Sequence, residues 1–399
     1  MSPVASTRRD SAASSTPIAA CRVCGSGSGE VLLEFPAVPV NCSELHSTSA
    51  DARAATTAPL RLVLCPTCGY VCNQAFDPDV LTYDATYENA LDFSPSFREY
   101  LNGLAADLIG RHDLHGRTVV EVGCGQGSFL EALCAGGDNR GYGFDPSFRA
   151  DLDLSASIEI FTSLFDPATA TVRGDLYCAR HVLEHIPEPL EFLEKLRPAV
   201  VDGDATLYIE VPAGEAVFGG EATFDLNYPH VSYFSAPALA GLLGRAGFVV
   251  DRVDRRFGGQ YLSVEARATA TDAVPVPAGE IAAFADQARH AAATLDRVLD
   301  GARARIDDAT TRGRETALWG AGAKAVTFMA LVDRRVDAVV DINPRKLGSY
   351  MPGSGVAIDT PATLASRRPE VVFILNPMYR DEIAEMLAAD GVDAEVVVV

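Results

Sequence analysis

The chain has 399 residues, enough for two or three domains with a substantial core, which excludes a small disulfide-stabilised scaffold. With 22% charged, 48% hydrophobic and 8% aromatic residues, its composition is that of an ordinary soluble globular protein. A formal net charge of −21 works against binding to nucleic acid or to anionic membrane surfaces, so we expect neither as a partner.

The first twenty residues are rich in Ser, Ala and Thr and lack the apolar run of about 7–15 residues that a signal peptide requires. The chain also lacks a run of roughly 18 or more consecutive apolar residues, which speaks against a transmembrane helix. We therefore expect residues 1–20 to form a flexible tail and the protein to be cytoplasmic.

Two Cys-x-x-Cys-Gly turns occur in the first part of the chain. In a cytoplasmic protein such cysteines favour thiol and metal chemistry over disulfides. Each turn can direct two thiolates toward one tetrahedral zinc ion, and the glycine lets the backbone turn back. A redox dithiol or simple buried thiols are the alternatives, and we expect Cys42 and Cys72 to be buried thiols. We predict a zinc-binding domain over residues 21–85 in which a structural Zn²⁺ is bound by Cys21, Cys24, Cys65 and Cys68.

From Thr118 onward, short apolar strands alternate with helical stretches, which predicts an α/β fold with a parallel sheet. Helices are expected to begin near Gly127, Pro189 and Ala236. The predicted strands are Thr118–Val122, Gly141–Asp145, Ser157–Phe161, Asp175–Ala179, Ala205–Val211, Phe248–Val253 and Tyr261–Ala266.

An alanine-rich stretch predicts a long linker helix within residues 271–312. The strand pattern then resumes at Thr316, Ala338, Val371 and Ala394. We expect residues 313–399 to form a second, smaller α/β domain.

A glycine-rich segment, Glu121-Val-Gly123-Cys-Gly125-Gln-Gly127, runs from a predicted strand into a predicted helix. The glycines let a ligand approach the backbone, and a helix N-terminus offers unpaired N–H groups. Asp145 ends the next strand, where a carboxylate can accept both hydroxyls of a ribose. The segment and Asp145 together predict a site for a nucleoside-containing cofactor.

The E-x-G-x-G-x-G pattern with its second acid resembles motif I of the class I S-adenosylmethionine-dependent methyltransferases. After the fourth predicted strand, the segment Cys178–Pro189 resembles the sequence at the same place in that family. The resemblance implies a Rossmann-like methyltransferase domain over residues 86–270 with S-adenosylmethionine as cofactor, and it adds Arg180 to the cofactor site. For Glu184 and His185 we favour packing and capping at a helix start.

The order of two cysteine turns, a tyrosine-rich segment (Tyr83–Asn89), this core and a C-terminal α/β unit resembles the zinc-containing sugar C-methyltransferases. These enzymes act on nucleotide-linked deoxyketosugars. The resemblance implies carbon methylation through a base-generated enolate, in deoxysugar or antibiotic biosynthesis, with a nucleotide-linked sugar as the small-molecule partner. An oligomer is possible.

In that family the base is the last histidine of a Tyr-His-Glu-His run before Ser-Tyr-Phe, and here that position is His230. A neutral histidine suits this role because its ordinary pKa of about 6.5 lies near working pH. The resemblance also implies catalytic roles for His181 and Tyr87. Substrate contacts are implied for Asn227, Tyr228 and Tyr233.

The sequence departs from that run, because Asn227 stands in place of the tyrosine and Pro229 in place of the glutamate. A non-sugar acceptor, or another S-adenosylmethionine-dependent reaction on the same scaffold, is therefore an alternative.

The C-terminal unit contains Gly320-Ala-Gly322-Ala-Lys324-Ala325, with Asp341 at the end of the next strand. Taken alone, this pattern matches a dinucleotide site and would make the protein a nicotinamide-dependent oxidoreductase. The family resemblance instead implies that Gly322, Lys324 and Asn376 bind the nucleotide end of the substrate. A non-enzymatic docking module is a third alternative.

Overall fold

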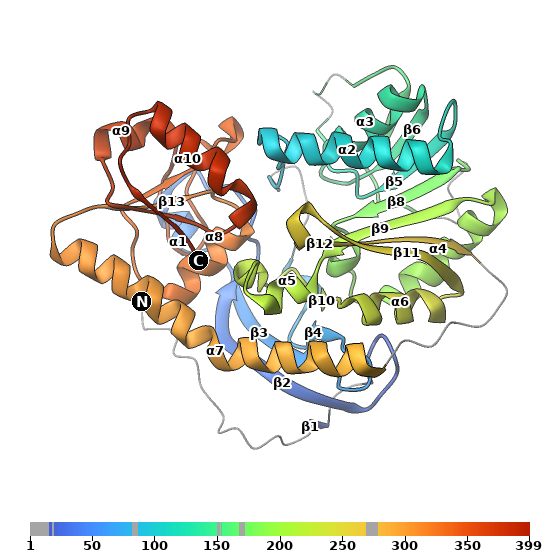
Figure 1. Ribbon diagram of the computed structural model, residues 1–399, viewed down its shortest axis with the longest axis horizontal. Coiled ribbons are helices and arrows are strands. Elements are labelled where there is room, and N and C mark those ends of the chain that lie inside the picture. The colour runs from blue at the N-terminus through green and yellow to red at the C-terminus, as the bar shows by residue number, and fades with distance from the viewer. Residues whose placement is uncertain are drawn as a thin grey trace.

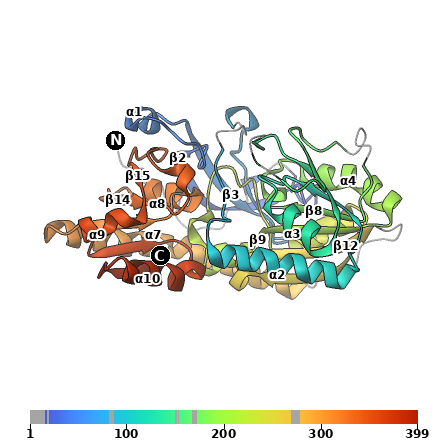
Figure 2. The same cartoon turned by 90° about the horizontal axis from the view of Figure 1, so that it is seen from above.

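The computed structural model describes residues 16–17, 20–81, 87–149, 152, 154–166, 172–268 and 278–399. An N-terminal lobe, a central α/β domain and a smaller C-terminal α/β domain lie side by side, and one long helix runs along all three (Figures 1 and 2). Most of the expected tail over residues 1–20, Tyr83 and its neighbours at 82–86, and residues 271–277 of the expected linker lie outside the described residues.

The N-terminal lobe is built on an antiparallel sheet in the order β1-β2-β3-β4-β10. Its last strand, β10 (Ser232–Tyr233), comes from the central domain and pairs with β4, so that Ser232 lies opposite Cys72 and Tyr233 opposite Val71. The lobe therefore shares a sheet with the segment that directly follows His230. Its other elements are β1 (Thr16–Pro17), β2 (Ser28–Pro39), α1 (Ser49–Arg53), β3 (Thr57–Leu64), β4 (Val71–Asn73) and η1 (Pro78–Val80).

The central domain contains a seven-stranded sheet in the order β11-β12-β9-β8-β5-β6-β7, which confirms all seven predicted strands. Successive residues point to opposite faces, so Val119 packs with one helix layer and Val120 with the other. The strands are β5 (Thr118–Val122), β6 (Arg140–Phe144), β7 (Ile158–Phe161), β8 (Leu176–Arg180), β9 (Thr206–Pro212), β11 (Phe248–Arg256) and β12 (Tyr261–Ala268).

The expectation of a parallel sheet is wrong for two strands, because β12 runs antiparallel to β9 and β11 antiparallel to β12. A short turn, η4 (Phe257–Gly259), joins β11 to β12, with Gly258 and Gly259 at positive φ. So short a connection forces neighbouring strands to run antiparallel, since a parallel pair needs a crossover of a dozen or more residues.

Helices cover both faces of this sheet (Figure 1). α2 (Pro95–His112) and α3 (Ser128–Gly137) pack on one face, and α4 (Pro189–Gly203) and α6 (Ala236–Arg245) on the other. The helices expected near Gly127, Pro189 and Ala236 are confirmed, whereas α2 was not predicted. The short elements η2 (Leu183–His185), α5 (Gly214–Gly219) and η3 (Thr223–Asp225) lie in loops that follow β8 and β9.

The long helix predicted within residues 271–312 is confirmed as α7 (Ala278–Thr311), which has 34 residues. Its Phe284 packs edge-on against Phe218 of α5, and its Arg289 forms an ion pair with Glu30 of β2 at 2.9 Å. None of the helices that the structure describes is both long and apolar enough to cross a membrane.

The C-terminal domain has a parallel sheet in the order β15-β14-β13-β16-β17, and the four strands predicted there are confirmed. The carboxyl ends of its central strands carry Gly322, Asp341 and Asn376. The elements are β13 (Thr316–Trp319), α8 (Ala323–Val332), β14 (Ala338–Val340), η5 (Pro344–Lys346), β15 (Ile358–Asp359), η6 (Pro361–Thr363), α9 (Leu364–Arg367), β16 (Val371–Ile374), η7 (Pro377–Tyr379), α10 (Arg380–Ala389) and β17 (Glu395–Val398).

Candidate active site

The glycine turn between β5 and α3 has the backbone that its sequence predicts. Gly123, Gly125 and Gly127 all have positive φ, a conformation that L-residues with side chains rarely adopt. A Cβ atom on Gly123 would lie 2.3 Å from Val182, whereas one on Gly125 would meet nothing within 4 Å. The turn is therefore closely packed at Gly123 and open at Gly125, and α3 begins without a side-chain cap.

Asp145 is hydrogen-bonded to this turn, since its Oδ2 accepts from the N–H of Gly125 at 2.8 Å. Glu121 lies buried at the end of β5, and among the described residues its Oε2 has no hydrogen-bond partner. Burial raises the pKa of Glu121 to about 8, although the positive charge of Arg180 opposes this rise. An open glycine turn, an adjacent carboxylate and a buried acceptor without a partner fit a polar cofactor with amino and hydroxyl donors.

Glu210 is the centre of a buried network at the end of β9. Its Oε1 accepts two hydrogen bonds from Arg180, at 3.1 and 2.8 Å, and its Oε2 accepts from the hydroxyls of Tyr100 and Tyr208. Burial alone would raise the pKa of Glu210, but the charge of Arg180 and contact with His181 hold it far below its ordinary value. The guanidinium of Arg180 also lies over the ring of Phe129. Arg180 thus lies beside the predicted cofactor residues with its charge balanced by Glu210.

His181 follows β8 and lies between two carboxylates. Its Nε2 is 3.3 Å from Glu210 and its Nδ1 is 3.7 Å from Glu184. Burial alone would lower the pKa of His181, but hydrogen bonding to these two carboxylates raises it to about 9. Its φ of 55° is unusual for a residue with a side chain, and such backbone strain is often found at functional sites. His181 is therefore a strained, cationic residue at neutral pH.

His230 lies buried in the loop between η3 and β10, where the sequence predicts the base. Burial lowers its pKa to about 4, so the ring is neutral at pH 7. Its ring stands edge-on to that of His185, with the centroids 5.0 Å apart. Burial also lowers the pKa of His185 to about 4, and its Nδ1 lies 3.0 Å from the carbonyl oxygen of Pro229. Polar atoms of Glu184, His185 and His230 gather within 4.8 Å of one another.

The loop residues expected to touch substrate make hydrogen bonds within the protein. Asn227 donates from Nδ2 to the carbonyl oxygen of Asp225 and lies 3.4 Å from Nδ1 of His230. The Tyr233 hydroxyl donates to the carbonyl oxygen of Asn227, and the Tyr228 hydroxyl accepts from the N–H of Asp77 in the N-terminal lobe. These contacts shape the loop around His230, and the substrate roles of these three residues stay predictions.

Tyr87 and Glu88 connect the lobe to both α/β domains. Tyr87 pairs through its backbone with Glu44, and burial raises the pKa of its hydroxyl to about 12. Glu88 is buried and accepts hydrogen bonds from Arg149 of the central domain and Asn343 of the C-terminal domain. The catalytic role predicted for Tyr87 stays a prediction.

In the C-terminal domain, Lys324 and Asn376 both contact Gln260 of the central domain. Lys324 also forms an ion pair with Asp225 at 3.0 Å, and it lies in the first turn of α8, next to Gly322. Asp341, the acid of the dinucleotide pattern, forms a buried ion pair with Lys346 at 3.0 Å. Because its carboxylate is already paired, Asp341 is poorly suited to bind a ribose, which disfavours the nicotinamide alternative.

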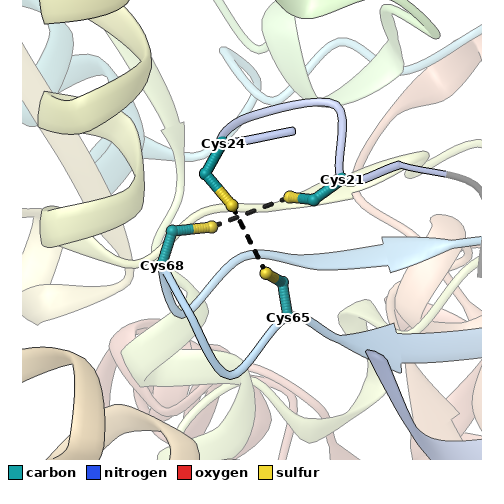
Figure 3. Close-up of side chains that lie close together, drawn as sticks. All are labelled: Cys21, Cys24, Cys65 and Cys68. Carbon is teal, nitrogen blue, oxygen red and sulfur yellow. Dashed lines mark hydrogen bonds between the residues drawn. The ribbon is translucent and has the colours of Figure 1, made fainter. Parts of the chain in front are cut away.

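The four predicted zinc ligands lie together in the N-terminal lobe (Figure 3). The Sγ atoms of Cys21 and Cys68 are 3.7 Å apart, and those of Cys24 and Cys65 are 3.6 Å apart. A tetrahedral ion with zinc–sulfur bonds of about 2.3 Å places neighbouring sulfurs about 3.8 Å apart, so the cluster fits zinc.

Sequence reasoning did not identify Glu210, Asp225, Gln260 or Glu88. The sequence did contain a sign of the role of Glu210, because a carboxylate within the apolar strand Thr206–Pro212 must be paired with a cation or a hydrogen-bond donor if it is buried. No sequence pattern could have identified Asp225, Gln260 or Glu88, since their partners come from distant parts of the chain.

Two family models match the chain. Residues 97–253 match a model described as a methyltransferase domain, and residues 279–397 match one described as a C-methyltransferase C-terminal domain. A search of curated proteins found no match.

Solved structures also show similarity to parts of the chain. The pyocyanin biosynthetic protein PhzM is 20% identical over 42% of this chain and 55% of that chain, with a TM-score of 0.34. The mitomycin 7-O-methyltransferase MmcR is 22% identical over 43% and 54%, with a TM-score of 0.35. The magnesium protoporphyrin IX methyltransferase of Synechocystis PCC 6803, with bound SAH, is 19% identical over 46% and 89%, with a TM-score of 0.35. The chain spans about half the length of the first two, and none of the three indicates its substrate.

Residues 97–253 thus form a methyltransferase domain with the class I S-adenosylmethionine-dependent α/β fold, which supports an enzyme. The C-methyltransferase C-terminal domain model covers α7 together with the C-terminal α/β domain.

Proposed function

We propose that the protein is an S-adenosylmethionine-dependent C-methyltransferase that acts on a nucleotide-linked ketodeoxysugar, with His230 as the base. The observation that carries the proposal is the buried imidazole of His230, which is neutral at pH 7 and stands where the family resemblance puts the base. The match of residues 279–397 to a C-methyltransferase domain supports methylation at carbon.

The proposed base must take a proton from the carbon next to a ketone. The Asn227 contact, at 3.4 Å, is close to the limit for a hydrogen bond, so it does not fix the tautomer of His230. His230 accepts the substrate proton at Nε2 when Nδ1 carries the proton of the ring. The C–H bond breaks, its electron pair forms the enolate, and His230 becomes an imidazolium cation near the carboxylate of Asp225, which favours the charged ring.

His181 is proposed to stabilise the enolate oxygen. It is cationic at neutral pH, and Glu184 and Glu210 keep it so. Its Nε2 lies 3.3 Å from Oε1 of Glu210, an oxygen that also accepts hydrogen bonds from Arg180, so His181 would act on the enolate oxygen through the positive charge of its ring.

The proposed cofactor site consists of Glu121, Gly123, Gly125, Gly127 and Asp145, with Arg180 beside it. Bound S-adenosylmethionine would supply the electrophilic methyl group for the carbanion. Asp145 would accept hydrogen bonds from the ribose, and the open side of the turn at Gly125 would allow close approach to the backbone. A structural zinc ion at Cys21, Cys24, Cys65 and Cys68 completes the proposal.

The likeness in domain order to the zinc-containing sugar C-methyltransferases supports a nucleotide-linked sugar as the substrate. A hydrogen–deuterium exchange assay tests this without the cofactor. Wild type should exchange the hydrogen next to the ketone of a thymidine diphosphate ketodeoxysugar in D₂O, and His230→Gln should not, while its affinity for S-adenosylmethionine stays unchanged.

Adding S-adenosylmethionine should give a product with a new carbon-bound methyl signal by NMR. If the cofactor binds but wild type neither binds the ketosugar nor exchanges its hydrogen, the sugar proposal fails and another acceptor must be sought. If His230→Gln exchanges as fast as wild type, His230 is not the base.

A further inference from the structure

Residues 223–231, which comprise η3 and the loop up to His230 and Val231, are called the His230 loop below. The C-terminal domain contacts this loop through the first two turns of α8. The ring of Phe224, in η3, meets that of Phe328 edge-on with the centroids 5.1 Å apart. One residue further along, Asp225 forms the 3.0 Å ion pair with Lys324, and both side chains are mostly buried, at 12% and 20% exposed. An ion pair with this little exposure is screened by water much less than a surface pair.

Gln260 of the central domain is a second partner of Lys324. Its Oε1 accepts a hydrogen bond from Nζ of Lys324 at 3.3 Å, and its Nε2 donates to Oδ1 of Asn376 at 2.7 Å. The carbonyl oxygen of Gln260 accepts from the N–H of Ala213, which anchors it in the central domain. The ammonium group of Lys324 is therefore held between two residues of the methyltransferase domain.

Asp225 is connected to His230 through Asn227. The carbonyl oxygen of Asp225 accepts hydrogen bonds from both the N–H and Nδ2 of Asn227. The carbonyl oxygen of Asn227 accepts from the N–H of His230, and Nδ2 of Asn227 lies 3.4 Å from the His230 ring. A continuous chain of contacts thus leads from Lys324 to the proposed base.

We propose that Lys324 is a positioning residue, through which the C-terminal domain holds the His230 loop in place and balances the charge of Asp225 beside it. This inference rests on the proposed function of His230 as the base. It gives the C-terminal domain a part in catalysis that does not require it to bind the substrate nucleotide.

The charged groups around His230 predict the effect of removing Lys324. Asp225 is on its own loop, Lys324 comes from α8, and His181, Glu184 and His185 come from the segment after β8. After burial, which is the largest cause of the lowered pKa, Asp225 raises the pKa of His230, while His181 and Lys324 lower it. Without Lys324 the effect of the Asp225 carboxylate is opposed by His181 and no longer by an ion-pair partner, so the pKa of His230 should rise.

Histidine-selective ¹³C NMR measures the pKa of His230 without any substrate and so tests this predicted rise. The His230 signal is assigned by its loss in His230→Gln. In wild type this signal should stay at its neutral position down to about pH 5, since the pKa is about 4. In Lys324→Met the midpoint should move up by about one unit and enter the measured range. Lys324→Arg should keep the wild-type behaviour, and so should Lys195→Met, which removes an exposed lysine that pairs with Glu191.

Asp225→Asn is a companion variant that should lower the pKa of His230 instead of raising it, because it removes a carboxylate that raises this pKa. Its His230 signal should stay neutral throughout the range. If Lys324→Met does not fold, Lys324→Gln removes the same charge and takes its place in the test. An upward shift in Asp225→Asn, or an unchanged midpoint in folded Lys324→Met, would overturn the inference.

Kinetics separate positioning from substrate binding. A positioning role predicts that Lys324→Met lowers kcat about tenfold and shifts the acid limb of the pH–rate profile upward, with partial recovery in Lys324→Arg. A lysine that binds only the substrate diphosphate would raise KM and leave both the pH profile and the NMR midpoint unchanged, which would refute the inference. An NMR shift in a protein that turns over no ketosugar would refute the proposed function and leave the contact between Lys324 and the loop intact.

Discussion

Replacing Cys65 by serine tests whether the four-cysteine cluster holds a structural zinc ion. The Sγ–Sγ distances of 3.6 and 3.7 Å are within about 0.2 Å of the tetrahedral value of about 3.8 Å. Binding of a structural zinc ion is worth about 10–16 kcal/mol, as much as the whole stability of a typical domain at about 5–15 kcal/mol. Loss of one of four ligands should therefore cost the lobe its folded state.

Unfolding of the lobe should also disturb the active site, because β10, which directly follows the His230 loop, belongs to the sheet of the lobe. β4 pairs with β10, which begins two residues after His230, and the hydroxyl groups of Tyr70 and Ser232 are hydrogen-bonded at 2.6 Å. We expect Cys65→Ser to lose its zinc, to unfold at lower temperature and to lose methyl transfer, even though it leaves the cofactor residues unchanged.

The assay is metal analysis of the purified protein together with thermal unfolding, and X-ray absorption should show four sulfurs at about 2.3 Å from zinc in wild type. Cys72→Ser is the matched control, since Cys72 lies on the neighbouring strand β4 and outside the cluster. It should keep one equivalent of zinc. Wild-type protein that binds no zinc when it is supplied, or Cys65→Ser that keeps a full equivalent and its unfolding temperature, would refute the reasoning.

Three further changes test the central domain. Gly123→Ala should lower the unfolding temperature, because the new Cβ would lie 2.3 Å from Val182; Gly125→Ala, which meets no protein atom within 4 Å, should be destabilised less but should weaken binding of S-adenosylmethionine in calorimetry, because its methyl group would occupy the open side of the turn, and an unchanged affinity would contradict this. Arg180→Met should lower the free energy of unfolding by up to about 3–5 kcal/mol in urea titrations at pH 7, since it leaves buried Glu210 with His181 in place of two cations, and the loss should shrink at acidic pH as Glu210 takes up a proton. The pKa of His181, raised to about 9 from about 6.5, stabilises the fold fully below about pH 6.5 and loses this effect as pH rises through 9, so up to about 3 kcal/mol should disappear over that window in wild type and not in His181→Gln. If the free energy of unfolding of His181→Gln falls over this pH window as it does in wild type, the effect belongs to another group.

Local patterns predicted much of the fold. The seven strands of the central sheet and the helix Ala278–Thr311 could be read from apolar periodicity, because each depends on residues close together in the chain. The glycine turn and the two cysteine turns were equally predictable, since particular backbone angles and ligand spacings demand those residues. Helix Pro95–His112 was missed although its Ser94 cap and Pro95 start are present in the sequence.

The partners of the charged residues could not be predicted in this way. Lys324 follows a glycine pattern typical of phosphate binding, yet its ammonium group lies against Asp225 and Gln260 of another domain. Asp341 had the position of a ribose acid, and Lys346 pairs with it. The neutral state of His230 and the cationic state of His181 likewise depend on burial and on neighbouring carboxylates.

The sequence by itself determined most of the elements, the glycine turn and the cluster of four cysteines, because propensity, periodicity and residue spacing act within short stretches of chain. Only the tertiary structure decided which charges meet across the domains and which histidine is neutral. Those outcomes depend on distance and desolvation, which arise only when remote segments pack together.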